Sequence, residues 1–105
     1  MANSGGGAAP YRVYLSGVIA ARVRQVQAQG TREGRGDAVL SAFREITSRL
    51  AWDPMNSGEP LYRLPGLRMQ VRQIAIRPLY VDFAVCEDLP LVFLKGVTLL
   101  SRQGY

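Results

Sequence analysis

Three apolar runs separated by very short connections dominate the second half of this chain. They span residues 68–76, 79–86 and 91–100 and are rich in Val, Ile, Leu, Phe and Tyr, which favour a pleated, half-buried backbone. Only Arg77-Pro78 joins the first run to the second, and residues 87–90 join the second to the third. Connections this short join neighbouring antiparallel strands. The sequence therefore predicts a three-stranded antiparallel meander.

The residues before the meander are predicted to form one strand and two helices that cover one face of the sheet. Residues 11–16 favour a short strand, which we place beside the third meander strand. Apolar residues at helical spacing predict helices over 17–30 and 37–52. These residues are Ile19, Val23 and Val26 in the first helix and Val39, Phe43, Ile46 and Leu50 in the second. We therefore predict an α+β fold, a two-helix hairpin packed on a mainly antiparallel four-stranded sheet, in the order β-α-α-β-β-β.

Local signals set the expected ends and irregularities of these elements. Asp37 is a favoured N-cap for the second helix, and Asp53-Pro54 ends it. We expect Trp52 to fill the gap between this helix and the sheet. Apolar residues change phase between Val71 and Ile74, which predicts a β-bulge near residues 72–73. The third run is apolar on both parities, as a central strand would be.

Composition limits the kinds of site that the chain can build. A chain of 105 residues is long enough for one domain, which we assign to residues 11–105 after a Gly-rich segment, 1–10, that is expected to be disordered. The single Cys86 excludes an intrachain disulfide, and the absence of His excludes a Cys/His zinc site. We expect no cofactor. No signal peptide or membrane span is recognisable, so we expect a cytoplasmic protein.

The net charge of +5 comes almost wholly from arginine, which supplies twelve of the thirteen basic residues. Residues 1–77 carry eleven Arg and five acidic residues, whereas residues 78–105 carry two basic and three acidic residues. Arginine pairs bidentately with phosphate and carboxylate, so this bias favours an anionic partner, either nucleic acid or an acidic protein segment. The alternative is that the arginines are ordinary solvated residues on helix surfaces.

Several short motifs lie at the end of the second predicted helix, before the meander and within it. They are Leu-Ala-Trp-Asp-Pro at 50–54, Gly-Glu-Pro-Leu at 58–61, Leu-Pro-Gly at 64–66, Tyr-Val-Asp-Phe-Ala-Val-Cys-Glu-Asp at 80–88 with Leu-Val-Phe at 91–93, and Ser-Arg-Gln-Gly-Tyr at 101–105. Together they resemble the RelE/ParE toxin superfamily. The resemblance covers residues 11–105. It implies the toxin of a bacterial type II toxin–antitoxin pair, inhibited by an acidic antitoxin. RelE-like members cut messenger RNA in the ribosome without a metal, and ParE-like members act on DNA gyrase.

Metal-free RNA cleavage needs a group that accepts the 2′-hydroxyl proton and cations that stabilise charge on the phosphorane. The candidate catalytic residues for this chemistry are Arg68, Arg72, Arg77, Arg102 and Tyr105, with Lys95 as a further cation beside the sheet. We expect Arg68 and Arg72 to share a strand face and to contact one phosphate. The alternative is that they form a solvated sheet face.

Three functions therefore remain open from the sequence. The chain is a RelE-like ribonuclease that binds messenger RNA and the ribosome, a non-catalytic ParE-like toxin that binds DNA gyrase, or a degenerate domain kept for protein binding. In each toxin interpretation we expect an acidic antitoxin to contact the sheet flank and the exposed helix arginines, namely Arg22, Arg24, Arg44 and Arg49.

Overall fold

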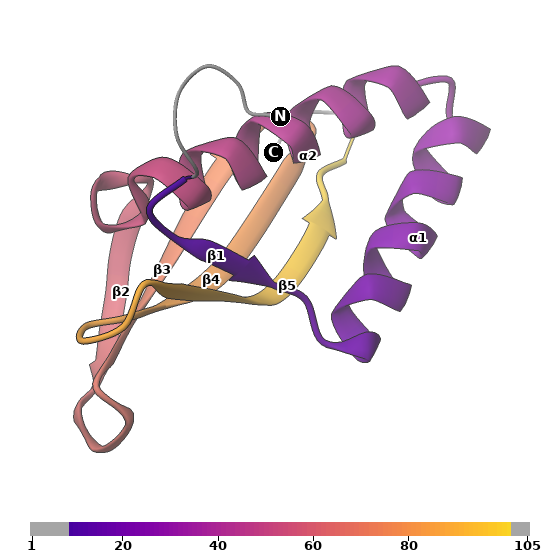
Figure 1. Cartoon of the computed structure of the whole chain (residues 1–105). Helices are drawn as coiled ribbons and strands as arrows, with labels where there is room; N and C mark the ends of the chain where they lie inside the picture. Colours follow the sequence, from indigo (N-terminus) through magenta and orange to yellow (C-terminus); the bar gives the residue numbers. More distant parts are fainter. Residues whose placement is uncertain (1–8, 102–105) are drawn as a thin grey trace.

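Two helices lie against one face of a five-stranded mixed sheet in the computed structural model, which describes residues 9–101 (Figure 1). The helices are α1 (Gly17–Arg32) and α2 (Gly36–Trp52). The strands are β1 (Arg12–Tyr14), β2 (Glu59–Leu64), β3 (Met69–Ile76), β4 (Leu79–Cys86) and β5 (Leu91–Leu99), in the spatial order β1-β5-β4-β3-β2. Two short 3-10 helices, η1 (Pro54–Asn56) and η2 (Pro65–Leu67), flank β2.

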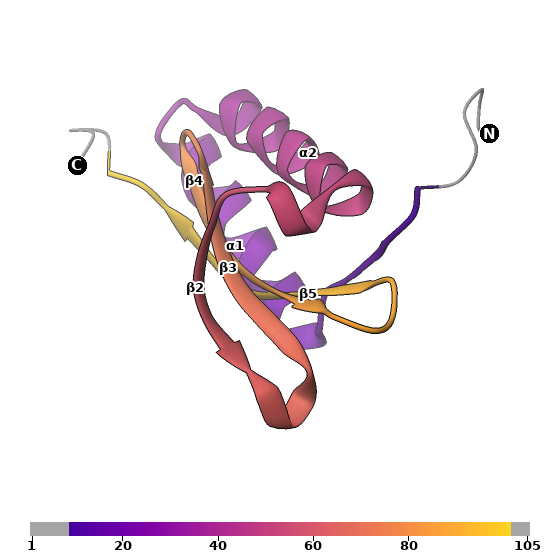
Figure 2. The ribbon, with the colours of Figure 1, turned by 90° about the vertical axis from the view of Figure 1, so that its left-hand side faces the viewer.

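The predicted α+β class and the antiparallel β3-β4-β5 meander are confirmed, but the prediction of four strands is wrong. The additional strand is β2, which pairs antiparallel with β3 at the edge of the sheet. The sequence predicts a loop at 55–60, which is rich in turn residues, and an irregular lead-in to β3 at 61–67. An edge strand tolerates proline, since only one of its sides must pair. The β2–β3 hairpin extends beyond the helical layer (Figure 2).

Strand β1 lies beside β5, as predicted, but the two run parallel. A parallel pair needs a long crossover connection, and the neighbouring helices α1 and α2 are part of the chain that separates β1 from the meander. The sheet is therefore mixed. Only three residues of β1 pair with β5, so the remainder of β5 is free of a strand on that side.

Both helices begin and end within two residues of their predicted positions, because each carries a continuous apolar stripe. The Ser16 hydroxyl caps α1 by accepting a hydrogen bond from the Ile19 amide at 3.2 Å. The prediction that Asp37 caps α2 is wrong: the cap position is Arg35, and Asp37 lies in the first turn. A carboxylate in the first turn still interacts favourably with the helix dipole. No helix among residues 9–101 is long and apolar enough to span a membrane.

The core lies between the helical stripes and the covered face of the sheet. Ile46 and Leu50 of α2 are fully buried there against a group of strand residues, namely Val81, Phe83, Val85 and Val92. The prediction that Trp52 fills this space is wrong, since 54% of its surface is exposed. Two residues after Leu50, the helix has turned by about 200°, which directs the indole away from the sheet.

The prediction of a bulge in β3 near residues 72–73 is wrong, and the bulges lie instead in β2 and β5. Strand β3 pairs with β4 without interruption, whereas the register shifts in β2 between Pro60 and Tyr62 and in β5 at Lys95. The β5 bulge explains why that strand is apolar on both parities. It changes the phase of the strand, so that all four of its main core residues face the helices, namely Val92, Leu94, Val97 and Leu99.

Candidate functional site

Arg68 lies outside the strand in which it was predicted. It ends η2 with a left-handed backbone (φ 53°), and β3 begins at the next residue. Its side chain is 66% exposed and its Nε lies 3.4 Å from Oδ2 of Asp88 in the β4–β5 turn. The backbone of Arg68 also joins the turn before β3 to the β4–β5 turn, because its carbonyl accepts a hydrogen bond from the Glu87 amide at 2.9 Å. Arg68 is a solvated cation at the tip of the sheet.

Arg72 is buried, with only 7% of its surface exposed. It pairs in register with Phe83, so it lies on the face that the helices cover. Its Nε donates to the Ser57 carbonyl at 3.0 Å and its Nη2 to the Gly58 carbonyl at 3.2 Å, while its Nη1 donates to the side chain of Gln70. These bonds use the guanidinium to hold the loop between α2 and β2. The expectation that Arg68 and Arg72 share one face is therefore wrong.

The remaining predicted catalytic residues are not brought to Arg68 or Arg72 within the described part of the chain. Arg77 is exposed in the β3–β4 turn, at the opposite end of the eight-residue strand from Arg68. At about 3.3 Å per residue, the nine residue steps from Arg68 to Arg77 separate the two arginines by about 30 Å. Arg102 and Tyr105 lie outside the described residues. Of the cations from which a ribonuclease site was predicted, the three that the structure describes are dispersed.

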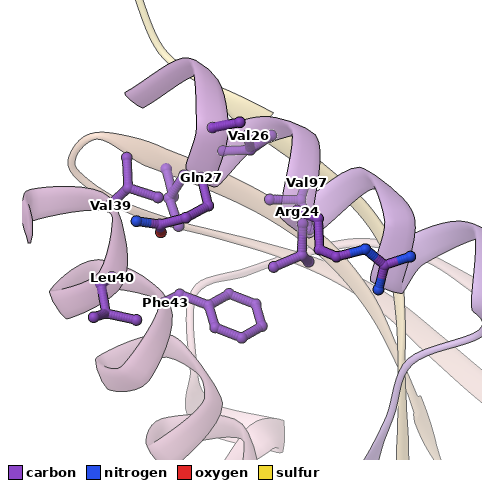
Figure 3. Close-up of a pocket in the computed structure, with 10 residues that line it drawn as sticks. Arg24, Val26, Gln27, Val39, Leu40, Phe43 and Val97 are labelled. Carbon is purple, nitrogen blue, oxygen red and sulfur yellow. The ribbon is translucent and has the colours of Figure 1, made fainter. Parts of the chain in front are cut away.

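An apolar groove of about 430 Å³ runs between α1 and α2 and reaches the sheet at Leu79 and Val97 (Figure 3). Its walls are mainly valine, leucine and phenylalanine side chains, including Val23, Val39, Leu40 and Phe43. Gln27 spans one end, where its Nε2 donates to the Gly36 carbonyl at 3.2 Å. Figure 3 shows the guanidinium of Arg24 pointing away from the apolar side chains, on the other side of the groove.

The sequence contains a signal for this groove. Leu40 follows Val39 on α2 but lies off the stripe that we had used to predict the helix, and it is 39% exposed. The apolar surface of α2 is therefore wider than the contact with the sheet requires. What could not be predicted is the spacing of the two helices, which leaves the groove open.

The helix arginines that were expected to contact an acidic partner differ in their freedom to do so. Arg24 and Arg44 are exposed. Arg49 is paired with Glu45 one turn earlier, at 2.6 Å. Arg22 is half-buried, and its Nε donates to the Val97 carbonyl at 2.9 Å. Arg24 at the groove and Arg44 on α2 are thus the better placed of the four.

The face of the sheet opposite the helices carries a row of residues aligned across all five strands. In register these are Tyr14, Phe93, Ala84, Val71 and Tyr62. The rings of Tyr14 and Phe93 stack with centroids 5.5 Å apart. Tyr14 and Tyr62 are 40% and 54% exposed, whereas the small residues between them are buried. This face is therefore partly closed by its own aromatic side chains.

The titratable groups near the tip of the sheet do not form a reactive centre. The Cys86 thiol is buried, and this burial, aided by the negative charge of Asp88, raises its pKa above the ordinary value. A raised pKa makes the thiol a poor nucleophile. Arg63 donates two hydrogen bonds to Glu87, which lowers the pKa of that carboxyl. Within residues 9–101, no three Cys, Asp or Glu side chains are grouped closely enough to hold a metal ion.

Comparisons of the chain with models of known protein families, with curated proteins and with solved structures find no match. The resemblance of the sequence to the RelE/ParE superfamily therefore stays a prediction.

Proposed function

We propose that this chain is the toxin component of a bacterial type II toxin–antitoxin pair and that it acts by binding a protein target, in the manner of ParE-like toxins on DNA gyrase. Support for the toxin assignment comes from the motifs at 50–66 and 80–93. It also comes from the helical hairpin that lies over a meander formed by the last three strands. Strand β2 is an addition to the order that the resemblance implies.

The observation that carries the choice of a protein target is the dispersal of the cations. A ribonuclease without a metal must gather positive charge around one phosphate. Here Arg72 is buried and bonded to backbone carbonyls, while Arg68 and Arg77 lie at opposite ends of β3. Arg68 is also paired with Asp88. Arg68, Arg72 and Arg77 therefore do not form a cluster of donors around one phosphorane.

The groove between α1 and α2 supports an acidic antitoxin helix as the inhibitory partner. An amphipathic helix binds such a groove through apolar residues one turn apart. Acidic residues beside its apolar stripe would meet Arg24 and Arg44, which are exposed on the same two helices. The apolar contact supplies most of the affinity, and the charge complementarity supplies orientation and a faster association rate.

Induced expression in a bacterial host tests the target. We compare the wild-type chain with Arg68→Ala and with the control Arg44→Ala, which removes the same charge from α2. We expect all three chains to arrest growth and to leave messenger RNA intact in the cells. We also expect each purified chain to inhibit the supercoiling of DNA by purified gyrase. Cleaved messenger RNA that becomes intact in Arg68→Ala would establish the ribonuclease instead. The absence of arrest by wild type would remove the toxin assignment.

The antitoxin proposal is tested with the product of the adjacent reading frame, co-expressed with the chain. Leu40→Glu places a charge in the groove, and Ser48→Glu places the same charge at an exposed position of the same helix. We expect Leu40→Glu to abolish co-purification and Ser48→Glu to preserve it. Equal retention of both variants would place the antitoxin elsewhere.

A further inference from the structure

A second hollow, of about 500 Å³, lies between the first turns of α1 and the C-terminal half of β5. It is lined by two cations, Arg22 and Lys95, by the polar side chains of Gln25 and Thr98, and by the apolar Val18 and Ile19. No carboxylate lines it. The volume lies in the range of small-molecule sites.

The backbone of β5 explains why Lys95 is directed here. Strand β1 pairs only with residues 91–93 of β5, so α1 lies beside the remainder of that strand. The register shift between the pairs Phe83–Leu94 and Asp82–Gly96 leaves Lys95 as the extra residue of a bulge. A bulge re-aims a side chain that would otherwise alternate with its neighbours. The only lysine of the chain therefore lines the same hollow as Arg22.

Arg22 is held in place but is not neutralised. Its Nε donates to the Val97 carbonyl at 2.9 Å, which fixes the plane of the half-buried guanidinium. In the part of the chain that the structure describes, the ion pairs of arginine involve Arg35, Arg49, Arg63 and Arg68, and neither Arg22 nor Lys95 takes part in one. Across the strands, Asp82 pairs in register with Gly96, and its Oδ2 lies 3.6 Å from the place that a Cβ of Gly96 would take. Asp82 forms no ion pair with Arg22 or Lys95. A half-buried cation without a counter-ion attracts an anionic ligand.

We propose that this hollow binds the phosphate group of a small phosphate monoester. The two Nη groups of a guanidinium suit two phosphate oxygens, and an ammonium group and a hydroxyl suit the others. A carboxylate has two oxygens and would leave part of this donor set unused. The apolar side chains of Val18, which is 79% exposed, and Ile19 offer a surface to the organic part of the ester.

Titration of the full chain, labelled with ¹⁵N, tests the site, with inorganic phosphate, adenosine 5′-monophosphate and adenosine as probes. We expect adenosine 5′-monophosphate to shift the amides of residues 95–98 and 18–22 and to bind more tightly than inorganic phosphate, and adenosine to bind more weakly than the monophosphate. Shifts spread over the whole surface, or equal binding of adenosine and its monophosphate, would overturn the proposal.

Matched variants separate a built site from a general effect of net charge. Lys95→Gln and Arg44→Gln each remove one positive charge from an exposed position. Both variants should therefore keep the wild-type fold, which the ¹⁵N spectrum of each variant without ligand checks. We expect Lys95→Gln to weaken binding of the monophosphate about tenfold, as loss of one charge-assisted hydrogen bond does, and Arg44→Gln to leave it unchanged. Equal weakening by both would refute the site. A further probe is a dinucleotide without a terminal phosphate. If it binds as tightly as the monophosphate, the hollow binds a nucleic acid backbone, and the proposal of a phosphate monoester is overturned.

Discussion

Replacement of Arg72 by alanine should destabilise the fold and leave function unaffected except through stability. The side chain is buried and donates to two backbone carbonyls and one amide oxygen. Each hydrogen bond from a charged donor contributes about 1.5–3 kcal/mol, and contributions within one network do not add fully. The Ser57 carbonyl, in a residue only 8% exposed, loses its guanidinium partner, whereas that of the exposed Gly58 has access to water. We therefore expect a loss of about 3 kcal/mol in the free energy of unfolding.

Urea denaturation followed by circular dichroism measures this loss, and thermal unfolding measures the accompanying change in Tm. A domain of this size loses about 4–8 °C in Tm per kcal/mol, so Arg72→Ala should lower Tm by about 12–24 °C. Arg68→Ala is the matched control: its side chain is exposed, and its single ion pair should contribute less than about 1 kcal/mol. Arg72→Lys keeps the charge but not the planar fork, so we expect an intermediate loss. A loss below about 1 kcal/mol in Arg72→Ala would refute the role assigned to this guanidinium.

Three further predictions follow from the described geometry. Gly58 has φ 64°, and a Cβ there would meet the Gln73 carbonyl oxygen at 1.9 Å. Gly58→Ala should therefore lower the free energy of unfolding, measured by thermal unfolding, by more than about 2 kcal/mol. The control Gly66→Ala, where a Cβ meets nothing within 4 Å, should change it by less than about 0.5 kcal/mol. Because Arg63 lowers the pKa of Glu87, the contribution of this pair to stability is present above the unfolded pKa of about 4.3 and is lost as pH falls through the folded pKa. A ¹³C titration of the Glu87 carboxyl should give an ordinary pKa in Arg63→Gln, and an unchanged pKa there would contradict the assigned cause. Cys86 should react with a thiol reagent at pH 8 far more slowly in the folded chain than in denaturant, and equal rates would mean that the thiol is accessible.

Periodicity predicted the helices and the meander because each of these elements buries one continuous stripe. In α2, Val39, Ile46 and Leu50 recur at helical spacing and all enter the core. Strand β2 could not be found in this way. Its residues are mostly exposed, so its pairing with β3 leaves no pattern of alternating burial, and Pro60 suggests loop.

The candidate site was harder to predict because it depends on the face and register of single residues. Spacing alone placed Arg68 and Arg72 together, but Arg68 belongs to the preceding turn and Arg72 lies on the covered face. The β5 bulge did leave a signal. Its core residues follow two-residue steps from Val92 to Leu94 and from Val97 to Leu99, with a three-residue step between them, which marks an inserted residue.

The contacts of Arg72 also bear on how the protein opens. The guanidinium belongs to β3, whereas the carbonyls that it holds belong to the loop after α2, which leads directly into β2. The Ser57 hydroxyl in turn donates to the Asp53 carbonyl at 2.6 Å, at the end of that helix. The last turn of α2, this loop and the edge strand should therefore lose protection against amide hydrogen exchange together, as one cooperative unit. The edge strand β2 has few buried side chains of its own. Because the side chain of Arg72 attaches it to the core, its amide hydrogens should exchange as slowly as those of the core.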